Sequence, residues 1–244
     1  MIEKMLFIFF LNNYKKNYSI IADIFYGIKE TRNLCLNCKN ISNPQNFICY
    51  NYELFHSLIF PLEEIKNMKY NNINNLQNQN NMNNIVSLYD CFEYNQKEEK
   101  FTGLNRSFCN LCQQYSDSVF FSKILYGPNV LVLILDRGKD NIYDIKLDFN
   151  ENIDLSNYIL EKDMNSMIYN LYGVISHLGE SGPSAHFVAS CKSPINYNWY
   201  RFNDSMVSSI SNFQKDILEF GTPYILFYKK QNYNGNFFDN YPFD

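Results

Sequence analysis

The spacing of hydrophobic positions changes along the chain and predicts an α+β protein whose second half is rich in strands. β-branched and aromatic residues dominate 46–60, which predicts a strand closed by Pro61. Between Val86 and Glu99 the apolar positions fall on one side of a helix, with charges gathering toward its C-terminal end.

The rest of the chain consists mainly of short alternating or apolar runs, which are typical of strands. These runs are Val119–Phe121, Val130–Leu135, Asp144–Phe149, Asn170–Ser176, His186–Cys191, Trp199–Phe202 and Tyr224–Tyr228. We therefore expect the second half of the chain to be rich in sheet, within a protein that is of α+β type overall.

Three segments show no usable period. Asn67–Asn84 is an Asn-rich insert that buries too little apolar surface to order itself, so we expect a solvated loop. A prion-like association role is the alternative interpretation of this insert. Residues 1–18 receive no assignment, and the tail 231–244 is expected to be disordered.

Charge and composition exclude several classes of partner. The 244 residues carry 21 Lys+Arg and 25 Asp+Glu, a net charge of −4, which argues against nucleic acid and anionic membranes. No stretch approaches the roughly 18–20 apolar residues of a membrane helix. The apolar run Met5–Leu11 lacks a basic flank and a cleavage site, so a secretory signal is not expected either.

Cysteine spacing gives the most specific chemical signal. Four of the seven cysteines form two CxxC pairs, Cys35/Cys38 and Cys109/Cys112. Each pair offers two thiolates from one tight turn, and two turns complete a four-cysteine zinc site with no open position, hence a structural one. Unrelated pairs are the alternative; a redox role is disfavoured because neither pair opens a helix after a strand. Metal-binding thiols favour a reducing cytoplasmic or nuclear compartment.

The chain has three histidines, His56, His177 and His186. His177 and His186 flank a Gly/Ser/Pro-rich loop, 178–185, and a histidine beside such a loop is suited to general-base catalysis. Asn203 or Asp204, which follow an aromatic strand, could orient the imidazole through its Nδ1 hydrogen. For His56 the simpler expectation is a packed or surface side chain.

Seven segments match one known family in sequence and in order. They are Asp23–Gly27, Phe101–Asn105, Gly127–Arg137, Tyr169–Gly179, Ala185–Pro194, Trp199–Val207 and Pro223–Tyr228. Together they resemble the ubiquitin-specific proteases, which are papain-like cysteine deubiquitinases. The resemblance covers residues from about 19 to 230, and its last four segments resemble the family's histidine box.

This resemblance implies a papain-like cysteine peptidase fold of the ubiquitin-specific protease type. Residues 19–125 would be the zinc-binding β fingers and 126–230 a mostly antiparallel β palm. His186 matches the catalytic histidine, Asn203 matches the third triad position, and Asp204 is the adjacent alternative. Ubiquitin and ubiquitinated proteins would be the partners, with the ubiquitin tail passing beneath the loop 178–185.

The family's nucleophile box, Gly-x-x-Cys-x-x-Asn-Ser, and the helical thumb that carries it do not occur in this sequence. Cys191 lies five residues after His186, on the opposite face of a strand and roughly 16 Å along it, so it cannot reach. Cys49 and Cys91 sit in apolar segments and are expected to be small buried residues. The resemblance therefore implies a deubiquitinase fragment without its nucleophile, and whether a separate chain supplies a thumb stays open.

Three positions depart from the family pattern: Gly138 replaces the usual Phe, Ala185 the usual Gly, and Phe187 the usual Tyr. Two alternatives therefore remain beside a fragment of an active enzyme. One is an inactive pseudo-enzyme or scaffold that binds ubiquitin, and the other is a structural zinc protein with a different partner.

Overall fold

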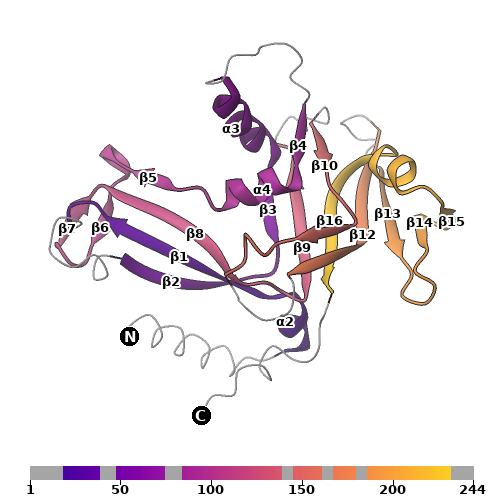
Figure 1. Ribbon diagram of the computed structural model, residues 1–244, viewed down its shortest axis with the longest axis horizontal. Helices are drawn as coiled ribbons and strands as arrows, with labels where there is room; N and C mark the ends of the chain where they lie inside the picture. Colours follow the sequence, from indigo (N-terminus) through magenta and orange to yellow (C-terminus); the bar gives the residue numbers. More distant parts are fainter. Residues whose placement is uncertain are drawn as a thin grey trace.

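Two β-sheets of unequal size form an elongated molecule (Figure 1). The computed structural model describes residues 19–38, 48–74, 84–138, 145–160, 167–179 and 186–231. The segment 1–18 and the tail after Gln231, on which two sequence-based expectations fall, lie outside the described residues.

The smaller sheet has four antiparallel strands in the order β2-β1-β8-β5. Their bounds are β1 Gly27–Cys35, β2 Ile48–Phe55, β5 Glu99–Phe101 and β8 Ser118–Tyr126. At the end of this sheet that is remote from the larger one, β6 (Ser107–Cys109) and β7 (Gln114–Ser116) form a short hairpin (Figure 1).

The larger sheet has eight strands, of which seven follow the order β15-β14-β13-β12-β16-β9-β3 while β11 pairs with β12. Their bounds are β3 Leu58–Pro61, β9 Val130–Asp136, β11 Asn152–Asp154, β12 Ile168–Leu178, β13 His186–Lys192, β14 Trp199–Asn203, β15 Met206–Ile210 and β16 Thr222–Lys230. Only β3 and β9 pair in parallel within it, so the expected mostly antiparallel palm is confirmed.

Helices and a small parallel ladder complete the described fold. The helices are α2 Ile20–Phe25, α3 Leu62–Asn74 and α4 Leu88–Asn95, with single turns at η3 Gly103–Asn105 and η4 Gln214–Leu218. β4 (Ile85–Ser87) pairs in parallel with β10 (Lys146–Asp148). Within the described chain no helix has the length and apolar character needed to cross a membrane.

The hydrophobic core belongs to the larger sheet and to helices α3 and α4. Phe60 of β3 and Phe92 of α4 are fully buried and meet edge-on, with ring centroids 5.4 Å apart. Alternating residues of β9, such as Leu131, Leu133 and Leu135, are buried in the same cluster. Burial of this many apolar side chains is the main stabilising contribution to this half of the molecule.

The helix predicted for 86–99 is shorter than expected. Residues 85–87 form strand β4, and α4 then starts at Leu88. The start is fixed by a capping box in which the Ser87 hydroxyl accepts from the Asp90 backbone N–H and the Asp90 carboxylate accepts from the Ser87 backbone N–H. This reciprocal pair satisfies two donors that the first helical turn leaves unpaired.

The expectation of a wholly irregular Asn-rich insert at 67–84 is wrong at its start. Helix α3 continues through Asn74, although 75–83 lie outside the described residues. Buried Leu62 and Ile65 anchor its first turn to the core, and tertiary packing of this kind outweighs the weak helix propensity of asparagine.

The strand predicted for 46–60 is two strands. β2 ends at Phe55, and β3 starts at Leu58 in the other sheet, so residues 56 and 57 carry the chain from one sheet to the other. Pro61 ends β3 instead of following it.

Cys49, expected to be buried, is exposed on β2, whereas Cys91 is buried as predicted. The boundary between fingers and palm stays a prediction, and β3 pairs in the palm sheet although it precedes residue 126.

Candidate metal centre and candidate catalytic pair

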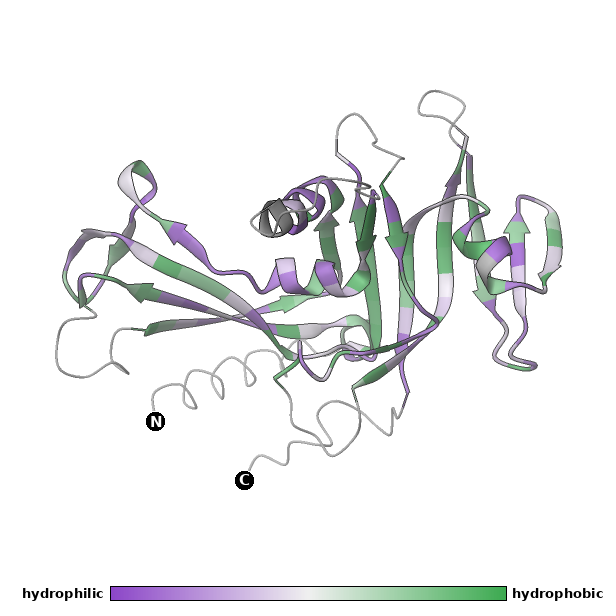
Figure 2. Cartoon of the chain, turned by 45° about the horizontal axis from the view of Figure 1, so that its top comes forward, coloured by the Kyte–Doolittle hydropathy of each residue, from purple (hydrophilic) through white to green (hydrophobic). Residues whose placement is uncertain are grey.

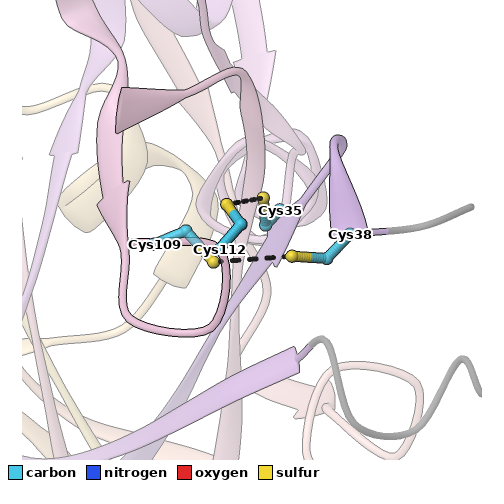
Figure 3. Close-up of side chains that lie close together, drawn as sticks. All are labelled: Cys35, Cys38, Cys109 and Cys112. Atoms are coloured by element: carbon cyan, nitrogen blue, oxygen red, sulfur yellow. Dashed lines mark hydrogen bonds between the residues drawn. The ribbon is translucent and has the colours of Figure 1, made fainter. Parts of the chain in front are cut away.

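Four cysteine sulfurs converge at the tip of the smaller sheet (Figure 3). Cys35 ends β1 and Cys38 follows in the next turn, while Cys109 ends β6 and Cys112 lies in the turn between β6 and β7. The four Sγ atoms all lie within 4.8 Å of one another. The two CxxC turns that the sequence singled out therefore meet in space.

The sulfur spacing fits a tetrahedral zinc ion. Four sulfurs at about 2.3 Å from zinc stand roughly 3.8 Å apart along the edges of the tetrahedron. The Cys35–Cys112 and Cys38–Cys109 Sγ atoms are separated by 3.9 and 3.7 Å. Both separations far exceed the roughly 2.05 Å of a disulfide, so these residues form a metal-binding set with all four positions supplied by protein.

The four thiols differ in pKa because their surroundings differ. The Ser116 hydroxyl lies 3.4 Å from the Cys112 sulfur and accepts from the Asn37 amide, and its hydrogen bond lowers the pKa of Cys112 to about 6. Burial among other sulfurs raises the pKa of Cys38 to about 12. Zinc binds thiolates, so at neutral pH the metal displaces protons from at least part of this set.

A histidine and an asparagine meet at one end of the larger sheet. His186 is the first residue of β13 and Asn203 is the last residue of the antiparallel neighbour β14, which brings the two side chains together. The His186 Nε2 and Asn203 Oδ1 atoms are 2.6 Å apart, a short hydrogen bond in which the ring N–H donates to the amide oxygen.

The nitrogen that makes this bond differs from the sequence-based expectation. Asn203 contacts Nε2 of His186 instead of Nδ1. With Nε2 protonated and fixed, the neutral ring carries its lone pair on Nδ1, which is the nitrogen able to accept a proton.

The remaining candidate residues lie elsewhere. Asp204 is an exposed turn residue with φ of 52°, and among the described contacts its carboxylate makes no bond to His186. His177 is buried on β12, where its ring packs edge-on against Phe187 at 5.1 Å. His56 is exposed and lies 5.9 Å from the ring of Tyr26. The loop at 180–185, which includes Ala185, lies outside the described residues.

The three cysteines outside the metal centre have no histidine partner in the described contacts. Cys191 lies in β13 with His186, and the odd spacing puts their side chains on opposite faces. Burial raises the pKa of both Cys91 and Cys191, which suppresses their thiolate forms. Cys49 is exposed on β2 of the other sheet.

Arg137 has a structural role that the sequence did not reveal. Its guanidinium is buried and donates to the carbonyl oxygens of Ile145 and Pro223 at 2.8 and 3.0 Å. These bonds tie the end of β9 to the start of β16. On its other side β16 pairs with β12, which in turn pairs with β13, the strand of His186. The signal in the sequence is an arginine close to the end of the apolar run Val130–Leu135, where burial of an unpaired charge would be costly.

The arrangement of a histidine–asparagine pair on a palm-like sheet and four cysteines on a finger-like sheet defines a class, the zinc-bearing papain-like peptidases. The model of the family described as "Ubiquitin carboxyl-terminal hydrolase" matches residues 8–228. The chain belongs to the ubiquitin carboxyl-terminal hydrolase family, of the ubiquitin-specific protease type.

Individual relatives agree with this placement. Ubiquitin carboxyl-terminal hydrolase 8 of Saccharomyces cerevisiae is 29% identical over 91% of this chain and 44% of its own length. Ubiquitin carboxyl-terminal hydrolase 48 of Rattus norvegicus is 32% identical over 50% of this chain and 12% of its own length. The chain thus spans less than half the length of these relatives.

A solved structure shares the fold. The "SAGA Ubp8/Sgf11/Sus1/Sgf73 DUB module bound to ubiquitin aldehyde" contains a chain with a TM-score of 0.64 and 27% identity, matched over 91% of this chain and 45% of that one. The fold class predicted from the histidine box and the zinc motif is confirmed as papain-like and of the ubiquitin-specific protease type.

Proposed function

We propose that this chain forms the fingers and palm of a deubiquitinase, which hydrolyses the peptide or isopeptide bond after the C-terminal Gly of ubiquitin. The observation that carries the proposal is the 2.6 Å contact between His186 and Asn203, the two residues that match the family's catalytic positions. Membership in the family and the likeness to a chain bound to ubiquitin aldehyde support ubiquitin and ubiquitinated proteins as the partners.

Each residue of the pair has a distinct role in this proposal. His186 takes the proton of the attacking thiol at Nδ1 and later gives it to the departing amine. Asn203 accepts from Nε2–H, which fixes the ring orientation and stabilises the charged imidazolium once it forms. The proposal assigns no role to Asp204, because the hydrogen bond to His186 is made by Asn203.

The proposal assigns the nucleophilic thiol to none of the seven cysteines of this chain. Four are committed to the metal centre, and the other three lie away from His186 or are suppressed by burial. We therefore propose that the thiol comes from polypeptide other than these 244 residues, in the same protein or in a partner chain. The zinc ion would hold the fingers in shape and take no part in the chemistry.

The protein purified from its own cells tests this function directly. We expect it to hydrolyse a fluorogenic C-terminal amide of ubiquitin, and thiol alkylation should abolish the turnover. His186→Ala should lower kcat/KM roughly 1,000-fold, because general acid–base catalysis contributes about that much. His56→Ala, which alters an exposed histidine of the linker between the sheets, is the matched control and should leave kcat/KM unchanged.

The other outcomes separate the alternatives. Binding of ubiquitin without turnover would identify an inactive pseudo-enzyme or scaffold, and no affinity for ubiquitin would indicate a structural zinc protein. Turnover by the recombinant 244-residue chain, abolished by one Cys→Ala substitution, would contradict the assignment of the thiol. All seven cysteines are free of disulfides, which supports the proposed cytoplasmic or nuclear compartment.

A further inference from the structure

Strand β15 forms an open edge of the larger sheet. It pairs with β14, and among the described strands nothing pairs with its other side. Figure 1 shows β15 at the end of the molecule opposite the smaller sheet. An unpaired edge presents a row of backbone N–H and C=O groups to which an extended chain can add.

The register of the hairpin identifies the outward groups. Asn203 is opposite Met206 across a two-residue turn, which makes them a hydrogen-bonded pair. Paired positions alternate along an antiparallel ladder, so the N–H and C=O groups of Val207 and Ser209 face away from β14. An incoming strand would find two donors and two acceptors at the ordinary spacing.

This edge carries none of the usual protection against pairing. The strand Met206–Ile210 has no charged residue, no proline and no bulge. Met206 and Val207 are 66% and 59% exposed, and Phe202, which faces Val207 across the ladder, is 43% exposed. A strand laid along β15 would cover part of this apolar surface as well as the backbone groups.

The edge is continuous with the candidate catalytic pair. Met206 faces Asn203, and Asn203 bonds His186, so three neighbouring strands connect the edge to the histidine. Strands in a sheet stand about 4.8 Å apart, which puts an added strand roughly 14 Å from the strand of His186. About four extended residues cover that distance at roughly 3.3 Å each.

We propose that β15 binds an extended segment of the ubiquitinated substrate by strand addition, a few residues away from the lysine that carries ubiquitin. This inference rests on the proposed function. A five-residue edge is too short for a stable dimer interface, whose area is usually about 1,600 Å² in total, but it suits a substrate that must leave after cleavage. The recognised class is an unstructured segment that can become extended, read mainly through its backbone and through apolar contact with Met206 and Val207.

Binding of a fluorescent peptide tests the edge without requiring catalysis. The probe is a twelve-residue segment of alternating Val and Thr, and its matched control carries N-methyl groups on alternate amides so that it cannot pair. By fluorescence anisotropy the 244-residue chain should bind the probe at least five-fold more tightly than the control. Val207→Pro, which removes an outward N–H, should weaken binding about five-fold, and Val207→Thr should not.

Kinetics of the protein from its own cells provide the second readout. Ubiquitin joined to a lysine four residues from the Val/Thr segment should be cleaved about five-fold faster, by kcat/KM, than the N-methylated conjugate. The same Val207→Pro variant should lose this preference yet cleave the ubiquitin fluorogenic amide normally.

Equal binding and equal cleavage of the two peptides would overturn the inference while leaving the proposed function intact. No turnover of any ubiquitin substrate would refute the proposed function, and the anisotropy result would still decide the edge. If Val207→Pro fails to fold, the comparison of the two peptides on the unaltered chain is decisive.

Discussion

The two sheets are stabilised in different ways. The larger sheet shares one extensive apolar core with α3 and α4, whereas the buried cluster at the tip of the smaller sheet consists of Cys35, Cys38 and Cys109 with Leu34 and Cys112 packed against it. Figure 2 shows hydrophobic residues concentrated where the helices cover the larger sheet. One half of the molecule is held by burial of apolar surface, and the tip of the other half by its metal.

Loss of one zinc ligand should have the largest effect. Cys109→Ser, or chelation of the metal, should remove metal-binding free energy on the order of 10 kcal/mol and unfold the tip of the smaller sheet. Amide hydrogen exchange should rise in residues 27–38 and 107–118 while β9, β12 and β16 stay protected. The control is Cys49→Ser, which removes an exposed cysteine of the same sheet. Uniform loss of protection in both sheets would contradict the division into two separately stabilised regions.

The candidate catalytic pair, His186 and Asn203, lies at an end of the larger sheet and should be independent of the zinc. In the protein from its own cells, Asn203→Ala should lower kcat/KM roughly 100-fold, since the ring loses its orienting acceptor. Hydrolysis of the ubiquitin fluorogenic amide provides the measurement. Asn203→Asp keeps an acceptor and should retain most of the activity, while Asp204→Ala should cost little; a larger loss with Asp204→Ala would reverse the assignment.

Arg137 tests how strongly buried polar bonds support the larger sheet. Arg137→Met keeps the volume but leaves the carbonyls of Ile145 and Pro223 without their donors, so the free energy of unfolding should fall by about 2–4 kcal/mol. Urea denaturation measures this change. Arg106→Met removes a half-exposed ion pair with Asp117 and should cost less than about 1 kcal/mol.

The capping box of α4 should give the smallest effect, and one that depends on pH. Burial tends to raise the pKa of Asp90, but hydrogen bonds from Lys69 and Ser87 outweigh it and hold the pKa below its usual 3.8. The contribution is therefore complete above about pH 4 and is lost as the pH falls through the lower folded value. Asp90→Asn should cost about 1 kcal/mol at pH 7 and less at about pH 3, where protonation of Asp90 has begun to remove the contribution. Thermal unfolding at the two pH values checks this, with the exposed Glu93→Gln as control.

The sequence was sufficient for features that depend on local spacing. The two CxxC pairs define the metal centre, and the apolar run at Val130–Leu135 corresponds to β9. Spacing alone does not separate Asn203 from Asp204, because which of two adjacent side chains meets His186 depends on the register of β14 against β13. A one-residue change of register would exchange their faces.

Errors arose where long-range packing outweighed local composition. Asparagine-rich residues continue α3 because Leu62 and Ile65, just after Pro61, are buried in the core. Ser87 and Asp90 carry a recognisable capping signal, but Val86 and Leu88 also fit a continuous helical face, so the pattern predicts a helix start that is too early. The break after Phe55 reflects the passage of the chain between two sheets, which no local pattern encodes.

The separation between the two halves of the metal centre has a consequence for synthesis. Cys38 and Cys109 are 71 residues apart, and both must leave the ribosome before the four-sulfur set can close. At translation rates of roughly 5–20 residues per second, the first pair waits about 4–14 seconds as two unprotected thiols. During that interval the two free thiols of the nascent chain are open to oxidation or to binding of the wrong metal. The yield of correctly folded protein should therefore depend on the supply of zinc and of reducing thiols in the cell during translation.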